Sequence, residues 1–351
     1  MNWYCSREDI KRAGQIFGNS RHSIIDRTIE SVSREIDTLT RRRFIPETAT
    51  KLFQWPQTWS NIGTRLWLRQ DLLSITTLQT KAQDSGPTTI SSSDYFLEPQ
   101  DLPGPYDRIE IDRSSTASFE SGDTPQRSIS VLGSWGYSAN TKGVGTVVSG
   151  LASDATATSV VISDGSTIDV GDTLLIGSEQ LFVTERASAA EPNSDLIDGA
   201  LTASRSEAVT VDSGSRYTVG EVILVDSEEM LIESISSNTL NVIRAYNATT
   251  LATHSNNQAV HVFRTLTVER GVNGTTAAVH ANSTAISKYE PEFDIRSLAI
   301  AMTLAEIAQE AASYGRTVGG GDGAFEFSGR ALKIRMDQTI NKYQRPMEFA
   351  V

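Results

Sequence analysis

The chain lacks several features that would point to particular classes of protein. Its 351 residues include a single cysteine, Cys5, which excludes an intrachain disulfide and a cysteine-based zinc cluster. No segment approaches the run of about 20 apolar residues that a membrane-spanning helix needs, so we expect no membrane partner. The first residues, MNWYCSREDIKRAG, lack the apolar stretch of a secretory signal, and we expect no such signal.

Positive charge is scarce in the middle of the chain. Residues 145–289 contain 17 acidic and 7 basic residues, which gives −10 of the total net charge of −12. An acidic surface repels phosphate groups, so this composition disfavours tight DNA binding. The same segment is rich in Ser, Thr, Val, Asp and Gly, which suits small β-units with many turns.

Both ends of the chain show helical patterns. Ser6 and Asp9 form an N-terminal capping signal. The apolar residues at 25, 29, 32, 36 and 39 then recur at spacings of four and three, which predicts a helix of about five turns. Near the C-terminus two further helical faces are marked by Ile300, Leu304, Ile307 and Ala311, and by Leu332, Met336, Ile340 and Tyr343.

Strand patterns lie between these helices. RLWLRQDLLSITTLQT, DYFLEP, RIEID and RSISVLGSWGY predict short strands separated by turn residues. We therefore predict an α+β fold, in which residues 1–144 and 290–351 build a helical frame and residues 145–289 form a β-rich insertion.

Two repeated phrases indicate how the insertion is organised. VGDTLLIGSEQLFV at 170–183 recurs as VGEVILVDSEEMLI at 219–232, an offset of 49 residues, whereas LNVIRAYNATTLATH at 240–254 recurs as LTVERGVNGTTAAVH at 266–280, an offset of 26. A tandem duplication would give one offset throughout. Nesting accounts for both offsets, with an inner unit at 208–262 inserted into an outer unit made of 158–186 and 264–288.

The repeats also carry the residues most suited to chemistry. His254 matches His280, and Glu179 matches Glu228. Metal binding would need further ligands at suitable spacing, and a glycosidase would need both carboxylates across one cleft. We expect structural roles for all four residues. No catalytic, cofactor or metal site is predicted, and we expect the chain not to be an enzyme.

The order of motifs in the two flanking parts resembles a known family. TRRRFIP ends the long helix, LWLRQDLLSITTLQT, DYFLEP and ISVLGSWGY follow, and INKYQRP ends the last helix. In this order they resemble the head-to-tail connector, or adaptor, proteins of tailed double-stranded DNA bacteriophages. The resemblance covers 1–144 and 290–351, and the long β insertion departs from the compact members of the family.

This resemblance implies a structural protein of the virion. Such adaptors form a ring, usually twelvefold, beneath the portal protein, extend the DNA channel and offer a docking surface to a tail or stopper protein. The implied location is the neck between capsid and tail, after assembly in the host cytoplasm, with no cofactor and no sequence-specific DNA binding. The implied portal-binding arm contains Lys342, Tyr343, Gln344, Arg345, Pro346, Met347 and Phe349.

Two further interpretations stay open at this stage. The basic run Arg41, Arg42 and Arg43 can complement the dipole at the end of a helix, or contact a neighbouring subunit or the DNA channel. The whole protein can instead be a capsid-decoration or host-attachment protein, whose acidic β-repeats bind carbohydrate or protein.

Overall fold

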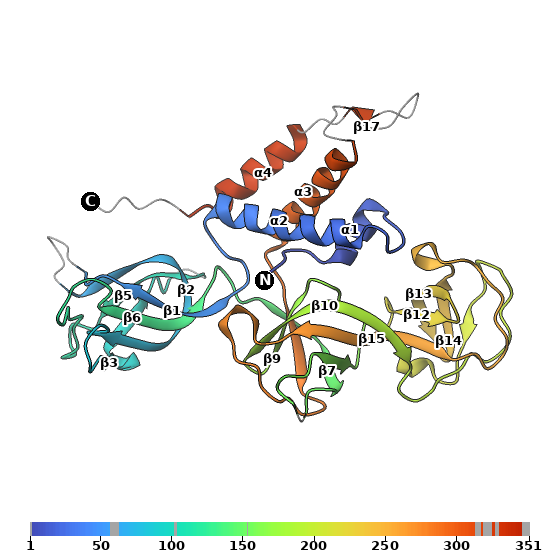
Figure 1. Ribbon diagram of the computed structural model, residues 1–351, viewed down its shortest axis with the longest axis horizontal. Coiled ribbons are helices and arrows are strands. Elements are labelled where there is room, and N and C mark those ends of the chain that lie inside the picture. The colour runs from blue at the N-terminus through green and yellow to red at the C-terminus, as the bar shows by residue number, and fades with distance from the viewer. Residues whose placement is uncertain are drawn as a thin grey trace.

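Three β-units lie in a row, and four α-helices of the described chain form a layer along one side of that row (Figure 1). The structure is a computed structural model that describes residues 2–345 except 57–62, 102–103, 153, 313–316, 319–324 and 327–329.

The helices begin and end close to where the sequence predicts them. Ser6 and Asp9 form the expected capping box at the first helix, and Ile25, Ile29 and Val32 on the second are buried. The face predicted for the third helix is rotated, since Ala311 is exposed while Leu298 is fully buried. The helices are α1 (Arg7–Gly14), α2 (His22–Thr40), α3 (Phe293–Ala311) and α4 (Arg330–Tyr343).

The first β-unit is a six-stranded sheet with its own core. Its strands follow the order β1-β6-β2-β5-β4, and β3 pairs with β2. Alternating residues of these strands, such as Leu72, Ile109, Val131 and Trp135, meet in one buried cluster. The strands are β1 (Glu47–Phe53), β2 (Arg65–Thr80), β3 (Thr88–Ile90), β4 (Tyr95–Glu98), β5 (Tyr106–Ile111) and β6 (Ile129–Trp135).

The second β-unit, which we call the outer unit, is a closed barrel. Its six strands pair in a ring, β10-β9-β16-β7-β8-β15, and β15 returns to β10. Its core is made of residues that alternate along these strands. The strands are β7 (Thr141–Ser149), β8 (Ser159–Ile162), β9 (Thr173–Ile176), β10 (Glu179–Ala190), β15 (Val260–Glu269) and β16 (Ala285–Tyr289).

The third β-unit, the inner unit, repeats this arrangement between β10 and β15. The first half of β15 pairs with β12, which pairs with β13, and β14 lies between β13 and β11. Bridges from Leu196 to Ala259 and from Ile197 to Val211 complete the ring. The remaining strands are β11 (Val209–Thr210), β12 (Val222–Val225), β13 (Glu228–Ser236) and β14 (Thr239–Ile243), and a separate hairpin joins β17 (Thr317–Val318) to β18 (Phe325–Glu326).

These pairings are the ones that nesting requires. Strand β15 pairs with β8 through Leu266 and with β10, and β16 pairs with β9 through Ile286. Segment 240–243 pairs instead with β13 and β11. The long strands β10 and β15 therefore run from the outer unit to the inner unit and connect the two (Figure 1).

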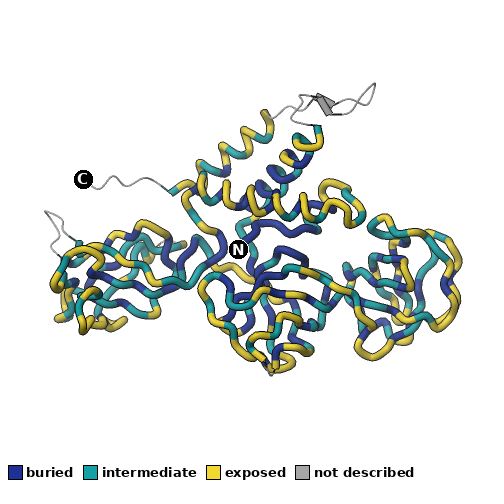
Figure 2. Tube along the Cα trace, viewed as in Figure 1, coloured by how far each residue is buried: buried dark blue, intermediate teal, exposed yellow. Residues whose placement is uncertain are grey.

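The predicted fold class, an α+β helical frame carrying a β insertion, is wrong. Strands hold 36% of the residues and helices 23%, and a closed six-stranded barrel stands at the centre. The helices do not build a frame of their own because their core includes Val170, Phe182 and Val272 of the outer unit. Figure 2 shows buried residues in the helices and in the part of the middle β-unit that lies next to them. Strands β1 to β6, which the sequence places in the frame, form a separate sheet.

Candidate functional site

The basic run at the end of α2 and the C-terminal segment meet at one carboxylate. Asp71, on β2, is 7% exposed and accepts hydrogen bonds of 2.9 Å from Arg42 Nη1 and from Arg345 Nη1. Burial raises the pKa of Asp71, and the two guanidinium groups oppose that rise. Arg345 also donates to the carbonyl oxygen of Leu68 at 2.7 Å, and its backbone N–H donates to Thr40 O at 3.0 Å. This junction fixes the C-terminal segment to both the helical layer and the first sheet.

The other members of the two predicted segments have separate environments. Arg41 ends α2 in the left-handed conformation, with φ of 55°, and Arg43 forms an ion pair with Glu47. Both arginines are exposed, so only Arg42 of the three is built into the junction.

The start of the predicted arm belongs to the fold. Tyr343 is 5% exposed and packs edge to face on Phe44 and Tyr137, at ring-centroid distances of 5.5 and 5.4 Å. Lys342 and Gln344 are exposed, and Lys342 donates to Asp294. Pro346, Met347 and Phe349 lie outside the described residues.

Each repeat encloses a buried carboxylate that organises its loop. In the outer unit, Glu179 accepts five hydrogen bonds: two from Arg270, one from His280 and one each from the backbone N–H groups of Gly271 and Ala278, at 2.7 to 3.1 Å. Burial would raise the pKa of Glu179, but these donors outweigh it and lower that pKa to about 2.

The inner unit repeats this centre atom for atom. Glu228 accepts from Arg244 Nε and Nη2, from His254 Nε2, and from the N–H groups of Ala245 and Ala252, at 2.7 to 3.0 Å. The Glu228 and Arg244 side chains are both 0% exposed. The paired Glu and His residues thus lie in matching buried hydrogen-bond networks, which agrees with the structural roles expected for them.

The arginine of each centre was missed by the sequence analysis. Arg244 and Arg270 stand at matching places in the repeated phrase, four residues after Leu240 and Leu266. A buried carboxylate needs a positively charged partner. A Glu and an Arg that both recur in the repeat therefore indicate a buried ion pair in each unit.

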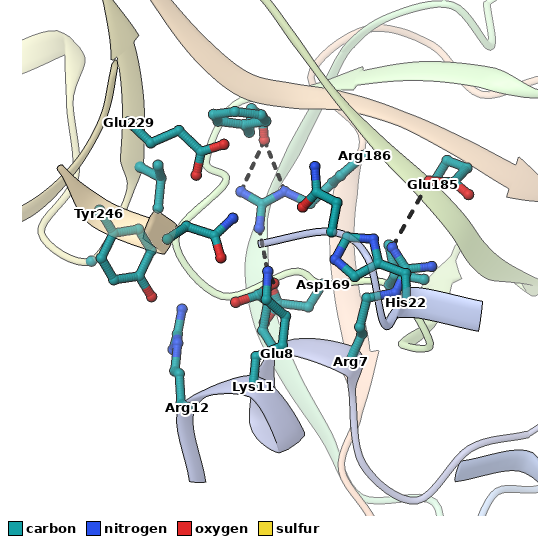
Figure 3. Close-up of a pocket in the computed structure, with 16 residues that line it drawn as sticks. Arg7, Glu8, Lys11, Arg12, His22, Asp169, Glu185, Arg186, Glu229 and Tyr246 are labelled. Carbon is teal, nitrogen blue, oxygen red and sulfur yellow. Dashed lines mark hydrogen bonds and ion pairs between the residues drawn. The ribbon is translucent and has the colours of Figure 1, made fainter. Parts of the chain in front are cut away.

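A cleft of about 220 Å³ lies between α1 and the two nested units (Figure 3). Three of its cations have acidic partners: Arg7 binds Asp26 at 2.6 Å, Lys11 binds Glu8 at 3.2 Å, and Arg186 binds Asp169 at 2.7 Å. The positive and negative charges in the cleft thus balance, and parts of its walls are apolar. Such a cleft suits a polar, uncharged ligand better than an anion.

One polar atom beside this cleft has no hydrogen-bond partner. His22 opens α2 and lines the cleft, and its buried Nε2 is unpaired within the described chain. Burial lowers the pKa of His22, and the nearby charges of Arg7 and Lys11 lower it further. The sequence analysis did not find this cleft, because its walls come from segments up to 256 residues apart, from Arg7 to Phe263.

Searches for other features and relatives gave few results. Within the described residues, no group of three or more His, Cys, Asp or Glu side chains is placed to hold a metal ion. None of the described helices is long and apolar enough to cross a membrane. No protein-family model, curated protein or solved structure matches the chain.

Proposed function

We propose that this protein is a structural component of a tailed-phage virion, a head-to-tail adaptor that forms a ring between portal and tail and extends the DNA channel. The proposal rests on the motif order in the flanking parts, together with the position of Arg345. The observation that carries most weight is the junction at Asp71, because it holds Arg345, a residue of the implied arm, against both the helical layer and the first sheet. An arm that is anchored at such a junction can present its neighbouring residues to a partner.

The packing of α4 supports assembly into a ring. Of its 14 residues only Thr339 and Tyr343 are buried, and Ile334 is 48% exposed. A helix of this length gains most of its stability from tertiary contacts. A neighbouring subunit that covers the open face of α4 would supply them.

The truncation that tests the arm must spare the residues that belong to the folded subunit. Removing 342–351 would take away Tyr343 and Arg345, which stabilise the subunit. The truncation therefore removes residues 346–351 alone. Val279→Lys serves as the control, since Val279 is 56% exposed on the outer unit and makes none of the hydrogen bonds of the junction.

The experiment measures binding to the portal protein of the phage that encodes this chain. We expect the full chain and Val279→Lys to form rings on the portal in negative-stain images and to co-sediment with it. We expect the truncated chain to keep its melting temperature and to bind at least about tenfold more weakly, a loss of roughly 1.4 kcal/mol. Equal binding by the truncated chain would refute the arm, and absence of rings with portal would refute the adaptor.

A further inference from the structure

The outer unit uses one face to bind the N-terminal segment of its own chain. Trp3 packs edge to face on Phe182, with ring centroids 5.3 Å apart, and covers Gly171 so closely that a methyl group there would sit 2.2 Å from the indole ring. Asn273 Nδ2 donates to Asn2 Oδ1 at 2.7 Å. This face therefore holds a short segment that bends before α1, by means of an aromatic side chain over a glycine and an amide hydrogen bond beside it.

The inner unit has the same face, because the two units are copies. The offsets of 49 and 26 residues fix the equivalent positions, and the backbone agrees with them: φ is 99° at Gly171 and 93° at Gly220, and 55° at Asn273 and 53° at Asn247. Val170, Gly171, Phe182, Val272, Asn273 and Tyr289 of the outer unit correspond to Val219, Gly220, Leu231, Tyr246, Asn247 and Phe263 of the inner unit.

No aromatic ring of the described chain packs on Gly220, although the loop before α2 reaches the edge of the inner face, where the Gly18 N–H donates to Asn247 Oδ1 at 3.0 Å. Val219 is 52% exposed, whereas its counterpart Val170 is 5% exposed. A methyl group at Gly220 would meet only Ser166, at an ordinary distance of 3.8 Å, where Gly171 meets the Trp3 ring. The position that the indole occupies on the outer unit is open on the inner unit.

This open face forms one wall of the cleft in Figure 3. Gly220, Tyr246, Asn247 and Phe263 all line it. Its volume of about 220 Å³ exceeds the roughly 150 Å³ of an apolar cavity that holds benzene. The cleft therefore has room for an aromatic ring and for part of the backbone that carries it.

One substitution on the face indicates the charge of the ligand. Gln180 of the outer unit, which accepts from Asn273 at 2.7 Å, is replaced by Glu229 in the inner unit. Glu229 lines the cleft beside Tyr246 and is hydrogen-bonded by Asn247 (Figure 3). A carboxylate at this place favours a neutral hydrogen-bond donor, such as an amide, next to the aromatic residue, because the charges of Lys11 and Arg186 already lie near it.

We infer that the inner unit binds a short peptide segment of a partner protein, with an aromatic side chain seated on Gly220 and a hydrogen-bond donor beside Glu229. The segment lies on the inner unit as residues 2–7 lie on the outer unit. This inference does not depend on ring assembly, since it follows from the duplicated face alone.

The chain itself supplies the probe. A fluorescein-labelled peptide, Asn-Trp-Tyr-Ser-Ser-Arg, copies residues 2–7 with serine in place of Cys5. We expect the full-length protein to raise its fluorescence anisotropy in a saturable way. The same peptide with alanine for tryptophan should bind about tenfold more weakly or less, because buried aromatic anchors dominate such interfaces.

Two protein variants locate the site. Val219→Lys places a charge on the exposed rim of the inner face and should weaken peptide binding about tenfold. Val279→Lys makes the same change at an equally exposed valine of the outer unit and should leave binding unchanged. Both side chains are exposed, so both variants should melt like the unmodified chain. Absence of saturable binding at millimolar peptide overturns the inference. Binding that Val219→Lys leaves unchanged also overturns it, because the peptide would then have replaced residues 2–7 on the outer unit.

Discussion

Replacing Glu228 by glutamine tests whether the buried carboxylate holds the inner unit together. Glutamine has the same shape, but one of the two oxygens becomes an NH2 group. Glu228 Oε1 receives two donors, and Oε2 receives Arg244 Nη2, Ala252 N–H and His254 Nε2. Whichever way the new amide turns, a donor therefore faces at least two other donors.

The size of the effect follows from two independent arguments. The pKa of Glu228 falls from its ordinary 4.5 to about 2. A difference of about 2.5 pKa units corresponds to roughly 3 kcal/mol in favour of the ionised, folded form. Removing one partner of a buried ion pair costs about 3 to 5 kcal/mol, because the other charge stays buried. We expect Glu228→Gln to lower the free energy of unfolding by about 3 kcal/mol at pH 7.

The stabilisation by Glu228 should decrease as the pH falls. The folded pKa lies below the unfolded one, so ionised Glu228 contributes its full stabilisation above about pH 5. That contribution is lost progressively as the pH falls from about 4.5 through the folded pKa of about 2, because the carboxyl group becomes protonated in both states only below it. The gap in stability between the unmodified chain and Glu228→Gln should therefore shrink between pH 5 and pH 2.

Urea unfolding followed by circular dichroism between pH 7 and pH 2 measures this gap. Hydrogen exchange with mass spectrometry locates it, and amides in residues 191–263 should lose more protection than those in 141–183. Glu233→Gln, at an exposed position of the same strand, controls for the loss of one negative charge. Equal stabilities at pH 7, or a gap that stays constant down to pH 2, would refute the role given to Glu228.

Two further predictions concern close packing. Gly171→Ala and Gly220→Ala impose nearly the same backbone strain, but only at Gly171 does the new methyl group meet the Trp3 ring. In urea titrations, the free energy of unfolding of Gly171→Ala should therefore be about 1 to 3 kcal/mol lower than that of Gly220→Ala. Equal losses would show that Trp3 does not cover Gly171. Tyr343→Ala removes a buried ring and should lower the free energy of unfolding by about 3 to 5 kcal/mol in the same assay. Lys342→Ala, at the neighbouring exposed position, should leave the melting temperature nearly unchanged. A stable Tyr343→Ala protein would mean that the arm begins earlier than Arg345.

The nested repeat could be predicted because its evidence is local. Each phrase keeps its apolar alternation and its turn residues, and two different offsets exclude a simple tandem order. The contribution of β7 could not be found in this way. Only Val147 and Leu151 match Ile197 and Leu201 at an offset of 50, and two apolar positions are too few to recognise.

The error in fold class came from contacts that no local pattern contains. The strand patterns between 65 and 137 were recognised, but the pairing of β2 with β6 and β5 depends on residues about 40 to 60 positions apart. The same holds for the helices, since Phe182 and Val272 complete their core from far along the chain. The junction at Asp71 joins Arg42 and Arg345, which are 303 positions apart and show no signal of proximity in the sequence.

The two copies differ where their surroundings differ and agree where they do not. The Glu, Arg and His of each centre close a loop inside one barrel, so both barrels need them whatever lies outside. The outward face has no such constraint: Gln180 meets the backbone of Pro46, whereas its counterpart Glu229 lines an open cleft. A change from amide to carboxylate would leave an uncompensated charge under the N-terminal segment, but it is tolerated beside water and can select a ligand. The interior of the barrel thus explains why the phrase occurs twice, and the outward face explains why the second copy could acquire a partner of its own.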